Sequence, residues 1–554
     1  MGKILPPLII DDFSRGMTND LRIGDTRYAK LIKNFDAHTY KGRLVPFRNS
    51  ESGNSVGDTD RIRNFLIALR TGTGADAANA FQNSIFGLGR VSGASERAEV
   101  QYKDLYTGQA NDLDDGDWTN TGSHQSGAGT ATDYDLFVWY KKANSGATLK
   151  GLIFGARDGT NFWAYDPTTT AAFADSNESV TYTDVAQGLV HPADDILYIP
   201  YTNATGTAGA FIASKNATAA MNLTALTLPR EFQVNSICVY GNYLAIGCSP
   251  ISGFGNSKVY LWDRVSASWN ETIDWGEGSL YILEEISGYL VGVSVVGGSS
   301  RIGKAFIGTS GGNLPVTTFN QKVVFRAYGG AKADIIREFR SNDSTASLSV
   351  KRAKQKVNNY LYFMLAMTFP DGNLQEGLWK IGKNAETGNW SVVLDRAPNN
   401  DTNTTSGTLH GFIFVGDYLF FAYDDNGTFA VSKTNDTATY TATSIYETII
   451  LNDGDSTITK KIKGIKVTHE PLPSGASVLV RYKIDDTIDD SSSFTTILTS
   501  DTDNAISKTA VNIESSGANL PEYKELVLRI ESTGGAIITG LQVKSEVIDK
   551  DLLS

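Results

Sequence analysis

The sequence has little of what catalysis and metal binding most often require. Its 554 residues include only five histidines, and no two of these share a metal-ligand spacing. We therefore expect each histidine to be a hydrogen-bonded or solvated side chain. No Gly-rich loop ends in Lys-Ser/Thr, and no Gly-x-Ser-x-Gly separates a strand from a helix, which excludes two common phosphate-binding and nucleophile motifs. The histidines are His38, His124, His191, His410 and His469.

Cysteine is also scarce, with two residues, Cys238 and Cys248, on the two arms of one expected hairpin. A two-residue turn at 241–242 places Cys238 opposite Ala245 and Cys248 opposite Asn235. The two sulfur atoms are then out of register for a disulfide. The sequence predicts two reduced thiols in the core.

Segments that would direct the chain to a membrane are missing. No apolar run approaches the roughly 20 residues of a transmembrane helix. The N-terminal stretch "MGKILPPLIIDDFSRG" is interrupted by Pro6-Pro7 and ended by Asp11-Asp12, so it makes a poor signal peptide. Gly2 lacks the Ser or Thr at position 6 that myristoylation requires. We expect a soluble protein made in a cytoplasm, without membrane insertion.

Basic residues are outnumbered, with 49 Lys and Arg against 61 Asp and Glu and a net charge of −12. This balance argues against non-specific binding of nucleic acid through a basic surface. It is compatible with a protein that DNA passes without specific binding.

Glycine and aromatic residues are abundant, with 54 Gly, 24 Tyr and 25 Phe. This composition favours strands separated by tight turns. One unit recurs four times, in which a turn of two residues is followed by Tyr-Leu at the start of an apolar strand. The four stretches are "VYGNYLAIG" from Val239, "EISGYLVGV" from Glu285, "KVNNYLYFM" from Lys356 and "FVGDYLFFA" from Phe414.

Each copy is followed by a further strand-like stretch, and weaker copies lie upstream. The further strands begin at Lys258, Gly303, Gly377 and Gly427, and the weaker copies begin at Ile62, Gly151 and Asp195. A meander of roughly 45 to 70 residues has the length and content of a β-propeller blade. We predict an all-β fold with a propeller of about six or seven blades over residues 61–443. The Tyr-Leu pair is interpreted as a packing signature, with a ligand-binding role as the alternative.

The flanking regions differ from this repeat. Residues 1–60 are expected to be an extended segment, and the polar stretch 97–135 is expected to be an exposed insert. The best candidate for a helix is "AKADIIREF" from Ala331. Residues 444–554 contain alternating strands of similar length, typical of a jelly-roll-like β-sandwich.

No constellation predicts an enzyme or a metal site, so we expect no catalytic residue and no cofactor. The acidic run at Asp112, Asp114, Asp115 and Asp117 begins like a calcium loop, but Gly116 comes one place early and Ser123 stands where the bidentate Glu belongs. The stretch around Asp158 lacks the Ser of the Asp-box found in sialidases. Trp163, Trp262 and Trp379 fall within expected strands, which favours packing over a sugar platform.

The first 50 residues carry a loose pattern. It comprises Asp12-Phe13 with Gly16, then Asn34-Phe35-Asp36, and then Gly42-Arg43-Leu44 with Arg48. In this pattern and in its order of domains the chain resembles structural proteins of tailed phages, including the nozzle proteins of short-tailed phages. Arg48 departs from the pattern by one place, since it stands four residues after Leu44 and not three.

The resemblance implies a role in the phage virion. Nozzle proteins form rings of six copies around a channel through which DNA leaves, contact the tail adaptor or portal proteins, and carry fibres or spikes. The sequence thus predicts a non-enzymatic virion protein of the tail that acts as a homo-oligomer. A receptor- or glycan-binding virion surface protein is the alternative, and a glycan-cleaving propeller enzyme is less favoured.

An open propeller would leave strand edges exposed at its first and last blades. Two strand-like pieces of the N-terminal segment could close the ring, "PPLIIDDF" from Pro6 and "GRLVPFRN" from Gly42. We expect one of them to pair with strands near residues 412–433. The alternative is that they reach a neighbouring subunit and join the oligomer.

Overall fold

The computed structural model describes residues 4–548 with internal gaps. The segments of five or more residues that it does not describe are 49–53, 71–81, 92–96, 105–117, 121–138, 144–149, 166–173, 204–208, 216–220, 297–320, 342–347, 398–407, 435–439 and 512–519. Within the described residues the regular structure is almost entirely β, with one short 3-10 helix, η3 (Asp485–Thr487). No helix in the described part of the chain is long and apolar enough to cross a membrane.

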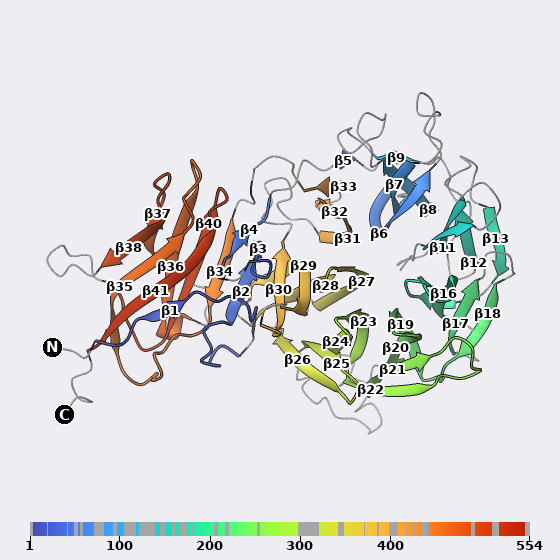
Figure 1. Ribbon diagram of the computed structural model, residues 1–554, viewed down its shortest axis with the longest axis horizontal. Helices are drawn as coiled ribbons and strands as arrows, with labels where there is room; N and C mark the ends of the chain where they lie inside the picture. Colours follow the sequence, from blue (N-terminus) through green and yellow to red (C-terminus); the bar gives the residue numbers. More distant parts are fainter. Residues whose placement is uncertain are drawn as a thin grey trace, which may run out of the picture.

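The described residues form seven antiparallel sheets arranged as a ring, which is a seven-bladed β-propeller (Figure 1). Blade one contains β6 (Thr59–Arg70), β7 (Gln82–Val91), β8 (Arg97–Asp104) and β9 (Thr119–Asn120). Blade two contains β10 (Trp139–Ala143), β11 (Lys150–Arg157), β12 (Asn161–Tyr165) and β13 (Ala174–Ser179). Blade three contains β14 (Tyr182–Val185), β15 (Leu189–His191), β16 (Ile196–Asn203), β17 (Ala210–Lys215) and β18 (Asn222–Thr227).

The remaining blades repeat the same meander. Blade four contains β19 (Phe232–Tyr240), β20 (Tyr243–Pro250), β21 (Asn256–Trp262) and β22 (Glu271–Glu277). Blade five contains β23 (Ser279–Ile286), β24 (Tyr289–Val296), β25 (Lys322–Tyr328) and β26 (Ala333–Arg340). Blade six contains β27 (Leu348–Val357), β28 (Tyr360–Thr368), β29 (Leu374–Lys383) and β30 (Trp390–Arg396). Blade seven contains β31 (Thr408–Val415), β32 (Tyr418–Asp425) and β33 (Thr428–Lys433).

The innermost strands of the blades contact one another around the centre of the ring, with β15 in this position in blade three. Contacts run from β19 to β23, β27, β31, β6, β10 and β15 and back to β19. Blade seven takes its fourth strand from the N-terminal segment, because β5 (Asn54–Ser55) pairs with β33. The N-terminal segment therefore closes the ring at the expected blade. The closing residues are those of β5, which lies after both of the pieces that were predicted to close it.

Those two pieces join the sandwich instead. β1 (Leu8–Ile10) pairs with β41 (Ile538–Val547), and Leu44 forms a bridge with Ile538. β3 (Phe35–Asp36) and β4 (Val45–Pro46) form a small hairpin between the two domains. The expectation that either piece closes the propeller is wrong, since their apolar side chains pack in the core that the sandwich shares with blade six.

The C-terminal domain is a sandwich of two sheets. One sheet contains β1, β41, β35 (Lys460–His469), β38 (Ser507–Val511) and β39 (Glu522–Tyr523). The other contains β34 (Ser444–Thr448), β40 (Leu526–Thr533), β36 (Ser477–Ile484) and β37 (Thr495–Ser500). A strand that the sequence analysis did not identify, β2 (Ala29–Lys33), pairs with β30 on one side and β34 on the other. Blade six and this half of the sandwich thereby form one continuous sheet of nine strands.

Three local predictions are corrected by the structure. The stretch from Ala331 contains the strand β26 and no helix, because its backbone pairs along the length of β25. The insert cannot begin at residue 97, since Arg97–Asp104 is the third strand of blade one. The third strand of blade five is β25, whereas the stretch from Gly303 that was expected to form it lies outside the described residues.

The hairpins of the repeat are formed as predicted. In the four copies the strands meet at Tyr240 and Tyr243, Ile286 and Tyr289, Val357 and Tyr360, and Val415 and Tyr418. The Leu that follows each Tyr is buried in every copy, whereas each Tyr is partly exposed at the hairpin end. The Leu is therefore a packing residue, whereas Tyr243 of the first copy is exposed enough to contact a ligand.

The prediction of two reduced core thiols is confirmed, because both cysteines are free and buried. Cys238 lies opposite Ala245 as predicted, but Cys248 lies opposite Val234. The register shifts at Asn235, whose side chain turns away to bond Ser249 and the backbone of Leu280.

Candidate functional site

The N-terminal motif residues meet at the joint between propeller and sandwich. Phe13 is buried against Tyr446 of the sandwich, with ring centroids 5.1 Å apart in an edge-to-face arrangement. Gly16 has a φ of 67°, and a Cβ there would lie 2.8 Å from the backbone oxygen of Val392 in β30. Glycine thus lets the segment run directly against the outer strand of blade six.

Asn34 connects blade six with the sandwich. It is fully buried with a φ of 60°, a conformation that Asn tolerates better than most residues. Its side-chain oxygen accepts a hydrogen bond from the backbone N–H of Ala397 at 2.9 Å, and its Nδ2 donates to the backbone oxygen of Thr443 at 3.2 Å. Its own carbonyl accepts from the Ser444 hydroxyl at 2.9 Å. One side chain therefore ties the end of blade six to the start of the sandwich.

A buried cluster of ionisable groups lies beside Asn34. Lys380 of β29 is 3.7 Å from Asp36 of the N-terminal segment and 3.9 Å from Asp395 of β30. The Lys380 ammonium also lies 4.4 Å from the centre of the Tyr360 ring. Burial and Lys380 lower the pKa of His38 to about 3 despite the opposing charge of Asp36, and burial raises the pKa of Asp395 to about 6. The cluster fixes the segment to blade six through charge as well as backbone pairing.

The same cluster contains a serine and a histidine in hydrogen-bond contact. The Nε2 atom of His38 lies 2.5 Å from the Ser391 hydroxyl. Such a pair can activate a nucleophile when a substrate reaches it. Ser391 is fully buried and His38 is 6% exposed, so no carbonyl carbon can approach the hydroxyl in this structure. The pair is a structural contact that sequence analysis could not find, since 353 positions separate its members.

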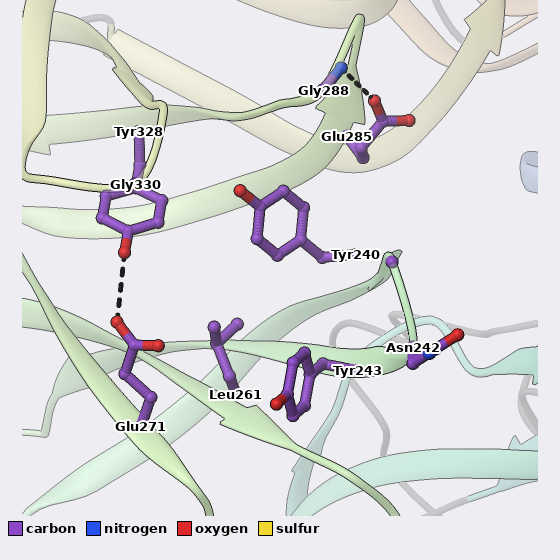
Figure 2. Close-up of a pocket in the computed structure, with 10 residues that line it drawn as sticks. Tyr240, Asn242, Tyr243, Leu261, Glu271, Glu285, Gly288, Tyr328 and Gly330 are labelled. Carbon is purple, nitrogen blue, oxygen red and sulfur yellow. Dashed lines mark hydrogen bonds between the residues drawn. The ribbon is translucent and has the colours of Figure 1, made fainter.

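A cleft of about 750 Å³ opens between blades four and five at the end that carries the Tyr-Leu hairpins (Figure 2). Blade four supplies Tyr240, Tyr243, Leu261 and Glu271, and blade five supplies Glu285 and Tyr328. The Tyr240 ring projects between the side chains of the two blades in Figure 2. The turns at Gly241, Gly288 and Gly330 complete the wall. The sequence feature that pointed to this cleft was the pair Tyr240 and Tyr243 on either side of one hairpin turn.

The cleft carries negative charge. The Tyr328 hydroxyl donates to Glu271 at 3.1 Å, and Lys356 forms an ion pair with Glu285 at 2.6 Å. Burial alone would raise the pKa of Glu285, but Lys356 and the backbone N–H of Gly288 lower it overall. Burial together with the two carboxylates raises the pKa of Tyr240. The arrangement can bind a cation or a hydrogen-bonding ligand.

The histidines named from the sequence do not gather in one place. His191 contacts Arg264, His469 contacts the Ser500 hydroxyl, and His410 lies against Phe429. His124 and the acidic run at 112–117 lie outside the described residues. Among the residues that the structure does describe, no group of three or more His, Cys, Asp or Glu side chains could hold a metal ion. Trp262 and Trp379 are buried, which confirms that they are packing residues.

The described residues define a seven-bladed β-propeller whose N-terminal segment joins it to a β-sandwich through one continuous sheet. No family model and no curated protein sequence matches this chain. Solved structures with distant similarity include the WD40 domain of Neurospora crassa Pan2, at 10% identity and a TM-score of 0.34 over 70% of this chain and 99% of that one.

Two further structures are similar at the same level. Raptor from Chaetomium thermophilum has 10% identity and a TM-score of 0.38, covering 70% of this chain and 30% of that one. A mutant of AofleA from Arthrobotrys oligospora has 10% identity and a TM-score of 0.32, covering 62% of this chain and 89% of that one. These similarities are too low to carry an argument about function, and none of the three is described as a phage protein.

Proposed function

We propose that the chain is a structural, non-enzymatic virion protein of a phage tail, either the nozzle or a component of the tail tip, which assembles into a ring homo-oligomer. The observation that carries the proposal is the joint. Residues of the N-terminal motif that resembles phage tail proteins, together with the strand β2 between them, fix propeller and sandwich to each other. Two domains that share one sheet are held to each other by backbone hydrogen bonds as well as by side chains, which suits a component of a rigid tail.

The charge balance supports the same role. A net charge of −12 gives little general attraction for the phosphates of DNA. DNA would pass a ring of such subunits without specific binding. The proposed partners are further copies of the chain, an adaptor or portal protein, and fibres or spikes, and the proposed location is the tail of the virion.

Assembly of the purified chain tests this proposal. Native mass spectrometry and electron microscopy should show closed rings when the chain is mixed with adaptor or portal proteins of the same phage. A filter-binding assay at low salt should show no retention of double-stranded DNA. The proposal fails if the chain remains a monomer with every tail partner and is absent from purified virions.

The cleft between blades four and five favours a second candidate, a receptor-binding protein of the virion surface. A ring that only passes DNA does not require such a cleft, whereas a cleft of this kind suits recognition of a group on a receptor. Saturable adsorption of the purified chain to host cells, lost when the cleft residues are changed, would favour this candidate over the nozzle.

A further inference from the structure

We propose that the cleft between blades four and five binds a basic side chain, an arginine or lysine presented by a loop of a partner polypeptide. This inference goes beyond the virion role and does not depend on it. The argument rests on three features of the cleft: its uncompensated carboxylate, its accessible aromatic rings and the shape of its mouth.

The first feature is the unequal pairing of the two carboxylates. Glu285 is neutralised by Lys356 and also accepts the backbone N–H of Gly288. Glu271 is exposed at the start of β22, and among the described residues its side-chain partner is the neutral hydroxyl of Tyr328. Among the described residues no basic side chain lies within ion-pair distance of Glu271. The cleft therefore keeps one negative charge that a cationic ligand would balance.

The second feature is the pair of rings beside that charge. Tyr243 is 38% exposed, Tyr240 is partly exposed, and both line the cleft with Glu271. A guanidinium or ammonium group over the face of a tyrosine gains about 0.5–2 kcal/mol, more as the site becomes drier. Leu261 and Tyr328 are buried beneath the cleft and give it an apolar floor on which the methylene stem of Arg or Lys can lie.

The third feature is the open mouth. The turns at its rim contain Gly241, Gly288 and Gly330, and a Cβ at any of these would meet nothing within 4 Å. The volume of about 750 Å³ exceeds that of one side chain and can admit the backbone of a loop that carries it. A free amine would leave most of this space empty, whereas the tip of a loop would fill it.

A neutral sugar fits the same chemistry less well. Sugar binding needs polar groups whose hydrogen-bonding capacity is still open. The Tyr328 hydroxyl is engaged with Glu271, and the Asn242 carbonyl accepts from Arg264. Glu271 carries a negative charge that a cation balances and a neutral sugar does not.

Saturation-transfer difference NMR on the full chain tests the inference. The probe is the tripeptide acetyl-Gly-Arg-Gly-amide, and its matched control contains citrulline, which has nearly the same shape without the charge. We expect saturable binding of the arginine peptide in the millimolar range and at least fivefold weaker binding of the citrulline peptide. Equal binding of the two peptides, or no saturable binding of the arginine peptide, would overturn the proposal.

Three variants locate the site. Glu271→Gln should weaken binding of the arginine peptide at least fivefold, whereas Asp501→Asn, which makes the same charge change on the sandwich, should leave it unaltered. Tyr243→Ala should weaken it similarly, and Tyr243→Phe should retain it because the ring and not the hydroxyl holds the cation. Wild-type affinity in Glu271→Gln overturns the proposal. So does saturable binding of maltose that Tyr243→Phe abolishes, since that result assigns the cleft to carbohydrate.

Discussion

Individual residues of the N-terminal segment adopt conformations that few other residue types tolerate. Gly16 and Asn34 both have positive φ, and both lie against backbone atoms of blade six or the linker that follows it. Sequence analysis identified these positions as part of a pattern but could not say why they matter. The reason is non-local, because their partners lie more than 350 residues away.

Gly16→Ala should destabilise the protein far more than Gly24→Ala. Both glycines have a φ near 70°, so each substitution places an L-residue in the left-handed region at a cost of about 1–2 kcal/mol. Only at residue 16 would the new Cβ overlap β30, which adds about 1–3 kcal/mol of overpacking. Denaturant unfolding measures both variants. Equal midpoints would show that β30 does not constrain the segment.

Asp395 makes a prediction about pH. The pKa of this buried carboxyl is about 6, above its value of about 3.9 in an unfolded chain. The folded protein therefore binds the extra proton between these values, and the stability gained by protonation is lost as pH rises from about 4 to 6. The free energy of unfolding of wild type should fall by about 3 kcal/mol relative to that of Asp395→Asn between about pH 4 and 6. It should fall no further above about pH 6.

Comparison with this variant isolates Asp395 from its neighbours. The charges of Lys380, Asp36 and Arg396 act on Asp395, and all three are present in both proteins. Asp501→Asn, a change of the same type at an exposed site, retains Asp395 and is the control. A stability difference between wild type and Asp395→Asn that is constant from pH 4 to 7 would contradict the argument.

At the scale of the element, the hairpins could be predicted from the sequence, whereas the strands that pair with distant parts of the chain could not. A two-residue turn with an apolar arm on each side is a local signal, and four such hairpins form with the expected pairing. The strand β26 was mistaken for a helix because its pattern is short and ambiguous, and its pairing with β25 decided its structure. β2 and β5 were missed because a five-residue and a two-residue strand depend on partners far along the chain.

The two residues of the Tyr-Leu repeat should separate in their effects on stability. Leu244→Ala removes a fully buried side chain and should cost about 2–5 kcal/mol. Tyr243→Ala removes a ring that is 38% exposed and should cost much less, about 1 kcal/mol. The measurement is the shift of the denaturant midpoint for each variant. A larger loss at Tyr243 would show that the tyrosine, not the leucine, is the packing residue of the repeat.

At the scale of the whole molecule, the two domains are more closely joined than the sequence predicts. The sequence predicts a propeller and a sandwich, and the structure contains both. The sequence does not predict that β2 joins the two domains into a sheet of nine strands. The parallel pairing of β2 with β30 leaves no local pattern in the sequence. The cleft escaped prediction for a similar reason, since its lining comes from two blades that only the ring brings together.

This coupling predicts a single unfolding transition that depends on Asn34. Asn34→Gly keeps the positive φ accessible but removes the side-chain oxygen that accepts from the buried Ala397 N–H, at a cost of about 1–3 kcal/mol, and it also removes the amide that donates to the Thr443 carbonyl. Asn504→Gly is the matched control, because Asn504 has a φ of 61° on an exposed loop of the sandwich. Calorimetry should show one transition for wild type and the control, and two transitions for Asn34→Gly as propeller and sandwich unfold separately. One unshifted transition in Asn34→Gly would mean that the shared sheet couples the domains without this residue.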